Sequence, residues 1–151
     1  MKIAKILILV LLVAFVGMQF VPTHCNLTSF IPKTDFALVN KIPKTIQEKI
    51  QTSCYDCHSN NTDYPWYSKI QPVAWYLENH IIDGKKQLNF NDWGKYSDRK
   101  KQSKLKFIIN QINNGEMPLP SYTLIHNDAI LSKSEKKLVI DYLRQLNNSL
   151  N

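Results

Sequence analysis

The stretch Cys54-Tyr55-Asp56-Cys57-His58 is the part of the sequence from which both the fold and the chemistry can be inferred. Two cysteines separated by two residues and followed at once by a histidine form a C-x-x-C-H motif, the pattern typical of covalent haem attachment. Two thiols at this spacing can add to the two vinyl groups of a haem, and the adjacent histidine can reach the iron. We therefore predict one covalent haem c, held by Cys54 and Cys57, with His58 as an axial ligand whose other ring nitrogen bonds to a backbone carbonyl.

Three other chemistries use closely spaced cysteines, and each fits this chain less well. A thioredoxin-like redox pair expects a surrounding βαβ pattern, which the sequence does not show. A structural zinc site needs four ligands, and beyond the motif the chain offers the isolated His80 and His126, without the paired spacing of zinc folds. A disulfide between Cys54 and Cys57 with no cofactor would leave the histidine of the motif unexplained.

Met117 is the candidate for the second axial ligand, because the other methionines fall in the N-terminal apolar stretch. It lies in the sequence Gly115-Glu116-Met117-Pro118-Leu119-Pro120. Flanking prolines restrict the chain and can hold the sulfur toward iron, and His/Met ligation raises the haem potential into a range useful for electron carriage. A lone methionine is otherwise a common filler of gaps in a core. His126, His80 or an open position that binds small molecules are the alternatives for the sixth site.

Hydrophobic periodicity and helix-bounding residues predict an all-α domain. We expect four helices and no sheet: from Thr45 into Cys54, from Val73 to Ile82 with Gly84 as the stop, through Leu105 and Ile112 with Gly115 as the stop, and after a capping box of Ser132 and Glu135. Asn89 or Asn91 is expected to cap a short turn that holds Trp93.

A group of aromatic residues is expected to pack around the porphyrin and between the helices. One of Trp66, Tyr67 and Trp93 could also donate a hydrogen bond to a haem propionate. The group consists of Tyr64, Trp66, Tyr67, Trp75, Tyr76 and Trp93.

The N-terminal segment, residues 1–23, predicts export from the cytoplasm. Lys2 and Lys5 precede an uncharged apolar run from Ile6 to Thr23, which approaches the roughly 20 residues that a membrane-spanning helix needs. Because no small-residue cleavage site follows, we expect an uncleaved transmembrane anchor in the cytoplasmic membrane with the body facing the periplasm. A cleaved signal segment and a soluble periplasmic body are the alternative.

The rest of the chain divides into a tether and one domain. Residues 24–44 contain prolines and show no sustained period, and residues 45–151 are expected to form the haem-binding domain. Cys25 is expected to be a free thiol or to form an adventitious disulfide, because the residues before it match a lipidation site poorly.

The formal net charge is +7, and a local excess of basic residues lies between Lys95 and Lys106. Such a run is most often a solvated helix face. In an exported protein it favours an acidic redox partner or anionic lipid headgroups. No aromatic interleaving suggests base stacking, so nucleic acid is not expected as a partner.

Several pieces of the sequence occur in an order that resembles the bacterial haem-binding domain family of small, membrane-anchored, monohaem c-type cytochrome-like proteins. The pieces are CYDCHSNNTDYPWYSKIQPVAW from Cys54, the segment 80–84, LNFNDW from Leu88, GEMPLPSY from Gly115, and His126 followed by Ala129, Leu131 and Ser132. The resemblance implies haem attachment at Cys54 and Cys57 and ligation by His58. It is compatible with Met117 as the distal ligand, although the family also carries a histidine that matches His126. A helix before C-x-x-C-H, a methionine loop and a closing helix also look like the class I cytochrome c fold.

These features predict a haem-binding c-type cytochrome that passes single electrons between a membrane oxidoreductase and a periplasmic acceptor. A haem-based sensor or a peroxidase-like enzyme with an open distal site is the second hypothesis. A haem-free module that holds zinc or a disulfide is the third.

Overall fold

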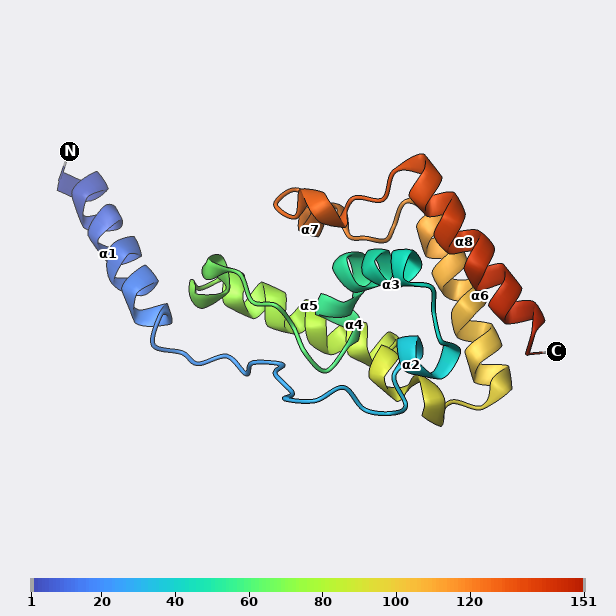
Figure 1. Cartoon of the computed structure of the whole chain (residues 1–151). Helices are drawn as coiled ribbons and strands as arrows, with labels where there is room; N and C mark the ends of the chain where they lie inside the picture. The colour runs from blue at the N-terminus through green and yellow to red at the C-terminus, as the bar shows by residue number, and fades with distance from the viewer. Residues whose placement is uncertain (1, 151) are drawn as a thin grey trace.

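The computed structural model describes residues 2–150 and consists of helices joined by loops, with no strand in that range (Figure 1). The all-α class is therefore confirmed for the described residues, while the likeness to a class I cytochrome c fold stays a prediction. A π-helical turn (Gln51–Tyr55) joins α3 to α4, and 3-10 turns cover Trp66–Lys69, Phe90–Lys95 and Asn127–Ala129. The α-helices are α1 (Lys2–Met18), α2 (Phe36–Asn40), α3 (Lys44–Ile50), α4 (Asp56–His58), α5 (Val73–Gln87), α6 (Asp98–Asn114), α7 (Pro120–Thr123) and α8 (Lys133–Asn148).

The helices expected from periodicity are present as α3, α5, α6 and α8, and caps account for the start of α8 and the end of α6. In α8 the Ser132 hydroxyl accepts from the Glu135 N–H at 3.2 Å, and the Glu135 carboxylate accepts from the Ser132 N–H at 2.8 Å, which confirms the capping box. Gly115 ends α6 in the left-handed conformation, with a φ of 71°, which glycine adopts without steric cost. The Asn89 side chain accepts from the Asn91 N–H at 3.0 Å and caps the Trp93 turn as expected.

The predicted stop at Gly84 is wrong, because α5 continues to Gln87. Gly84 instead allows a close approach between helices. A Cβ atom at this position would lie 2.7 Å from the backbone oxygen of Cys57, so only glycine lets α5 pack this tightly against α4.

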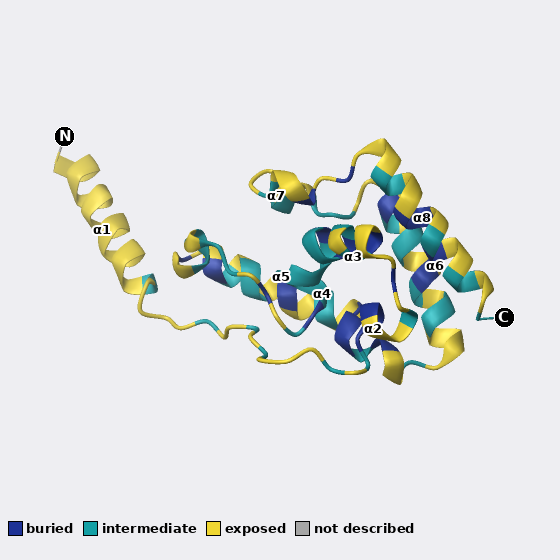
Figure 2. Cartoon of the chain, viewed as in Figure 1, coloured by how far each residue is buried: buried dark blue, intermediate teal, exposed yellow. Residues whose placement is uncertain are grey.

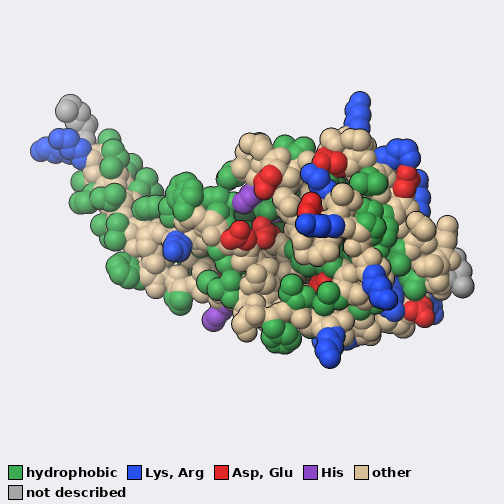
Figure 3. All heavy atoms as spheres, in the orientation of Figure 1, with side chains coloured by type: hydrophobic (Ala, Val, Ile, Leu, Met, Phe, Trp, Pro, Cys, Tyr) green, Lys and Arg blue, Asp and Glu red, His purple; other side chains and the backbone are tan. Residues whose placement is uncertain are grey.

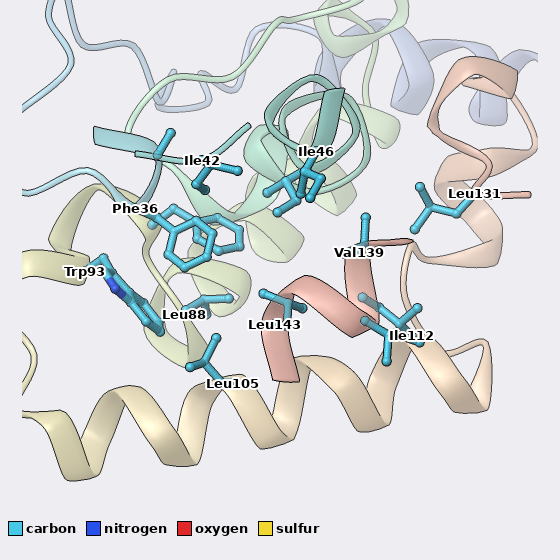
Figure 4. Packing of buried hydrophobic residues seen from close by; sticks show 14 residues of the cluster. Phe36, Ile42, Ile46, Leu88, Trp93, Leu105, Ile112, Leu131, Val139 and Leu143 are labelled. Atoms are coloured by element: carbon cyan, nitrogen blue, oxygen red, sulfur yellow. The ribbon is translucent and has the colours of Figure 1, made fainter. Parts of the chain in front are cut away.

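The main hydrophobic core lies between α3, α6, α8, the helix α2 with Phe36 and the 3-10 turn with Trp93 (Figure 4). Phe36, Trp93 and Leu105 are 0% exposed, and the rings of Phe36 and Trp93 meet edge to face with centroids 4.7 Å apart. Complete burial of a large apolar side chain contributes about 1.5–3 kcal/mol. This core therefore fixes α6, whose far end carries the Met117 loop.

The stretch 24–44, expected to be a tether, adds residues to this core. The α2 residues Phe36 and Ala37 are buried, and so is Asp35, which caps α2 by accepting from the Ala37 N–H at 2.9 Å. The Asp35 carboxylate also accepts from the Asn91 side chain at 2.8 Å and from the Tyr55 hydroxyl at 3.2 Å. Such a short helix has too few residues to show a period, which is why the sequence did not predict it.

The predicted transmembrane anchor is wrong: within the described part of the chain, no helix combines the length and the apolar character needed to cross a bilayer. The uncharged run does not continue as one helix, because α1 ends at Met18 and the chain then turns. The uncharged part of α1, from Ile6 to Met18, measures about 20 Å at about 1.5 Å per residue, well short of the roughly 30 Å of a hydrocarbon core.

The helix α1 extends away from the body and buries none of its side chains (Figure 2). Its surface in Figure 3 is almost entirely hydrophobic except at the start. Its end is tied to the domain through Gln19, whose side chain accepts from the Gln71 N–H at 2.9 Å and donates to the Gln71 carbonyl at 3.2 Å.

Candidate haem site

One cavity of about 340 Å³ brings together all four residues predicted to hold haem. Cys54, Cys57 and His58 reach it from the π-helical turn and α4, and Met117 reaches it from the loop between α6 and α7. The rest of the lining is mainly apolar and comes from α5, α6 and nearby loops. A volume of this size lies within the roughly 300–1,000 Å³ of small-molecule pockets, and apolar walls suit a flat, hydrophobic macrocycle.

The ring of His58 is held by two backbone carbonyls of neighbouring segments. Its Nδ1 lies 2.9 Å from the Gly84 oxygen and 3.0 Å from the Leu88 oxygen, so the N–H on Nδ1 donates to both. The predicted carbonyl partner is thus confirmed. With the proton held on Nδ1, the lone pair of Nε2 remains available for a metal ion.

Burial lowers the pKa of His58 below its ordinary value, and the two carbonyl contacts oppose that shift by stabilising the protonated ring. The neutral imidazole is therefore favoured at neutral pH. Neutral imidazole is the form that ligates iron.

The close approach at Gly84 and the anchoring of His58 depend on the same backbone. We expect Gly84→Ala to destabilise the protein by about 1–2 kcal/mol, because the clash with the backbone oxygen of Cys57 outweighs the roughly 1 kcal/mol that alanine adds to a helix. Displacement of α5 also moves the carbonyl that holds Nδ1, so the haem spectrum should change. Denaturant unfolding and the absorption spectrum measure both effects.

Lys86→Ala is the matched control, because it changes an exposed side chain in the last turn of α5 that does not line the cavity. It should leave both properties near those of the wild type. A Gly84→Ala protein at least as stable as the wild type, with an unchanged spectrum, would show that the close approach is not needed.

Both cysteines of the motif are free and partly buried. Burial, with a smaller contribution from Cys57, raises the pKa of Cys54 to about 12, and burial together with Asp56 raises the pKa of Cys57 to about 11. Both are therefore neutral thiols near pH 7. A redox-active pair of the thioredoxin type needs a thiolate with a lowered pKa, so these values argue against that alternative.

The zinc alternative depends on a cluster of metal-binding side chains. No group of three or more His, Cys, Asp or Glu side chains between residues 2 and 150 is arranged to hold a metal ion. Cys54, Cys57 and His58 therefore do not assemble a zinc site on their own.

Met117 is partly buried at the cavity wall and does not belong to the main core. Its backbone N–H donates to the Gln111 carbonyl at 3.2 Å, and the neighbouring Glu116 N–H donates to the same oxygen at 3.0 Å. The start of the methionine loop is thereby fixed to the end of α6.

The two alternative histidines occupy different places. His80 lines the cavity from α5, and its Nδ1 lies 2.9 Å from the Tyr76 carbonyl. His126 lies outside this cavity's lining, with its Nε2 2.7 Å from the Tyr67 hydroxyl and its ring stacked on Tyr122 at 4.2 Å between centroids. The Nε2 of His126 is therefore engaged by Tyr67.

The aromatic residues singled out from the sequence do not line this cavity. Trp93 is fully buried in the core, Trp66 is 76% exposed, and the Tyr67 hydroxyl is bonded to His126. The aromatic walls are instead Phe90, Phe107 and Tyr122. They come from three separate segments, and no local pattern in the sequence marks them.

Together, an all-α fold, two neutral thiols, an oriented imidazole and a thioether at one apolar cavity define the site of a haem protein. The sequence model described as the haem-binding domain matches residues 13–145, and the chain belongs to that family. Its cofactor is haem. The same sequence matches no curated protein and no solved structure.

Proposed function

We propose that this protein is a c-type cytochrome that carries single electrons with one covalently attached haem. The observation that carries the proposal is the convergence of Cys54, Cys57, His58 and Met117 on one mainly apolar cavity. Haem bound there would supply a one-electron couple between ferric and ferrous iron. The cysteines would hold the macrocycle by thioether bonds, which keeps the cofactor in place through repeated turnover.

Two protein groups would then set the properties of the iron. His58 offers Nε2 in a fixed orientation, because its Nδ1 is held by the carbonyls of Gly84 and Leu88. Met117 offers a soft thioether sulfur, and His/Met ligation stabilises the ferrous state relative to ligation by two nitrogen donors. The apolar walls limit access of water, which also favours the less charged ferrous form.

Met117 is favoured over His80 as the second iron ligand because the two residues lie on different segments of the chain. His80 lies on α5, the helix whose Gly84 carbonyl orients the ring of His58. Met117 comes from a different segment, the loop between α6 and α7, and can approach the cofactor independently of that helix.

An acidic redox partner at the periplasmic side remains our proposal for the physiological context. Part of the basic run is neutralised locally, since Lys95 pairs with Asp92 at 2.6 Å and Lys101 with Asp98 at 3.0 Å. Lys106 is exposed on α6, next to the cavity-lining Phe107. A positive charge there would attract an acidic surface toward the haem edge.

The test is a potentiometric titration of the purified haem protein, followed by exposure of the ferrous form to carbon monoxide. An electron carrier with two protein ligands should titrate reversibly with one electron and should bind carbon monoxide slowly or not at all. Rapid formation of a stoichiometric carbon monoxide complex would contradict the proposal. It would point instead to a sensor or a peroxidase-like enzyme with an open distal site.

A further inference from the structure

The short helix α7 follows the methionine loop directly and has few means of staying in place. Met117, Pro118 and Leu119 line the cavity, and Leu119 precedes the first residue of α7. The helix has four residues and buries none of its side chains. Its position therefore depends on polar contacts rather than on core packing.

The strongest of these contacts ends inside the haem-attachment motif. The Tyr122 hydroxyl donates to Asp56 Oδ2 at 2.7 Å, and Asp56 lies between Cys54 and Cys57. The other carboxylate oxygen of Asp56 accepts from the Asp63 N–H at 3.1 Å, so the acceptor is itself oriented. A hydrogen bond to a carboxylate is stronger than one between neutral groups.

A second contact holds the far end of the same segment. The ring of His126 stacks on Tyr122 with an interplanar angle of 14°, and its Nε2 lies 2.7 Å from the Tyr67 hydroxyl. Tyr67 belongs to the 3-10 turn just before α5. The loop segment is thus attached to two parts of the chain, the C-x-x-C-H motif at the cavity and the turn before α5.

We propose that Tyr122 and His126 are positioning residues that fasten the methionine loop over the haem, Tyr122 through Asp56 and His126 through Tyr67. Cys54, Cys57 and Asp56, which accepts from Tyr122, belong to one short helical segment. The haem and the methionine loop would therefore be attached to the same part of the chain. This inference rests on the proposed ligation of iron by Met117. It gives His126 a role other than that of iron ligand.

Burial, the hydrogen bond to Asp56 and the charge of Asp56 all raise the pKa of Tyr122 above its ordinary value. The hydroxyl therefore keeps its proton and remains a donor throughout the range in which the protein is studied. The Tyr122–Asp56 hydrogen bond should therefore persist across neutral and mildly alkaline pH.

The experiment measures how easily free imidazole displaces Met117 from ferric iron in the holo-protein. Because the loop must open first, the apparent affinity for imidazole reports the population of the open state. Tyr122→Phe keeps the ring that stacks on His126 and removes only the hydroxyl. Loss of a hydrogen bond to a carboxylate should raise the imidazole affinity by roughly 10- to 100-fold and weaken the thioether-to-iron absorption band.

Tyr142→Phe is the matched control, because it removes one hydroxyl from α8, away from the cavity lining, and should bind imidazole as the wild type does. Tyr67→Phe tests the second contact and should raise the affinity several-fold. Covalent haem content and helical circular dichroism verify that each variant is folded.

The variants separate the fastening of the loop from the ligation of iron by Met117. Higher imidazole affinity in Tyr122→Phe and Tyr67→Phe, but not in Tyr142→Phe, supports it. If Tyr122→Phe and Tyr67→Phe both bind imidazole with wild-type affinity while the wild type shows the thioether band, the fastening is overturned and the ligation by Met117 is not. A wild-type protein that lacks the band overturns the ligation by Met117 and the fastening together.

Discussion

Replacement of Cys54 and Cys57 together by alanine is expected to abolish covalent haem. The two thiols are the groups in the cavity that can add to haem vinyls, and both line it. Protein exported in a host with c-type maturation machinery should go from one covalent haem per chain to none. His58 and Met117 would remain, so any haem recovered should dissociate on denaturation. A pyridine haemochrome spectrum before and after denaturation measures this change.

Cys25→Ala is the matched control, because this exposed cysteine lies outside the cavity and should not affect the haem content. Each single variant of the motif should keep one thioether bond and show a shifted haemochrome band. Full covalent haem in the double variant would disprove the attachment site. If the wild type also lacked haem, the motif would have to be explained by the thiol or the zinc alternative.

Replacement of Met117 by leucine is expected to remove the second axial ligand while leaving the fold intact. Leucine has a similar volume but no sulfur, so the expected loss of stability is less than about 1.5 kcal/mol. The thioether-to-iron band should vanish, and the reduction potential should fall by on the order of 0.1 V, because axial ligands tune this potential over several tenths of a volt. The ferrous variant should bind carbon monoxide readily. Absorption spectroscopy and potentiometric titration record these changes.

Leu119→Ala is the corresponding control, because Leu119 lines the same cavity from the same loop and has no donor atom. It should keep the band. If the wild type lacks the band and its six-coordinate iron becomes five-coordinate in His80→Ala, the ligand is His80. Loss of the band in His126→Ala would indicate an opening of the loop rather than direct ligation, since His126 lies outside the cavity lining and its Nε2 is bonded to Tyr67.

The sequence predicted the helices that carry a full amphipathic stripe and failed on those that do not. The α8 capping box and the left-handed Gly115 at the end of α6 follow from local residue preferences, and both are present. The helices α2 and α7 have five and four residues, too few to show a period, yet one enters the core and the other follows the methionine loop. The helix stop predicted at Gly84 is wrong, because a glycine that ends a helix and a glycine that allows close packing of another helix look alike in a sequence.

The predicted membrane anchor is wrong for the opposite reason, because one uncharged apolar run in the sequence is not one helix in the structure. Hydropathy treats the run from Ile6 to Thr23 as one unit, because it measures composition and not backbone path. The helix ends at Met18, and the Gln19 side chain bonds to Gln71 beside the body. The hydrogen bond between Gln19 and Gln71 joins residues far apart in the chain, so a local hydropathy pattern does not reveal it.

The sequence by itself determined the C-x-x-C-H motif, the candidate ligands and the helical class, because each depends on residues a few positions apart. Only the tertiary structure decided which backbone carbonyls orient His58, which aromatic rings line the cavity, and that Tyr122 bonds to Asp56. These contacts join residues 26 to 66 positions apart. Local periodicity carries no information about such pairs, because they meet only after the helices have packed.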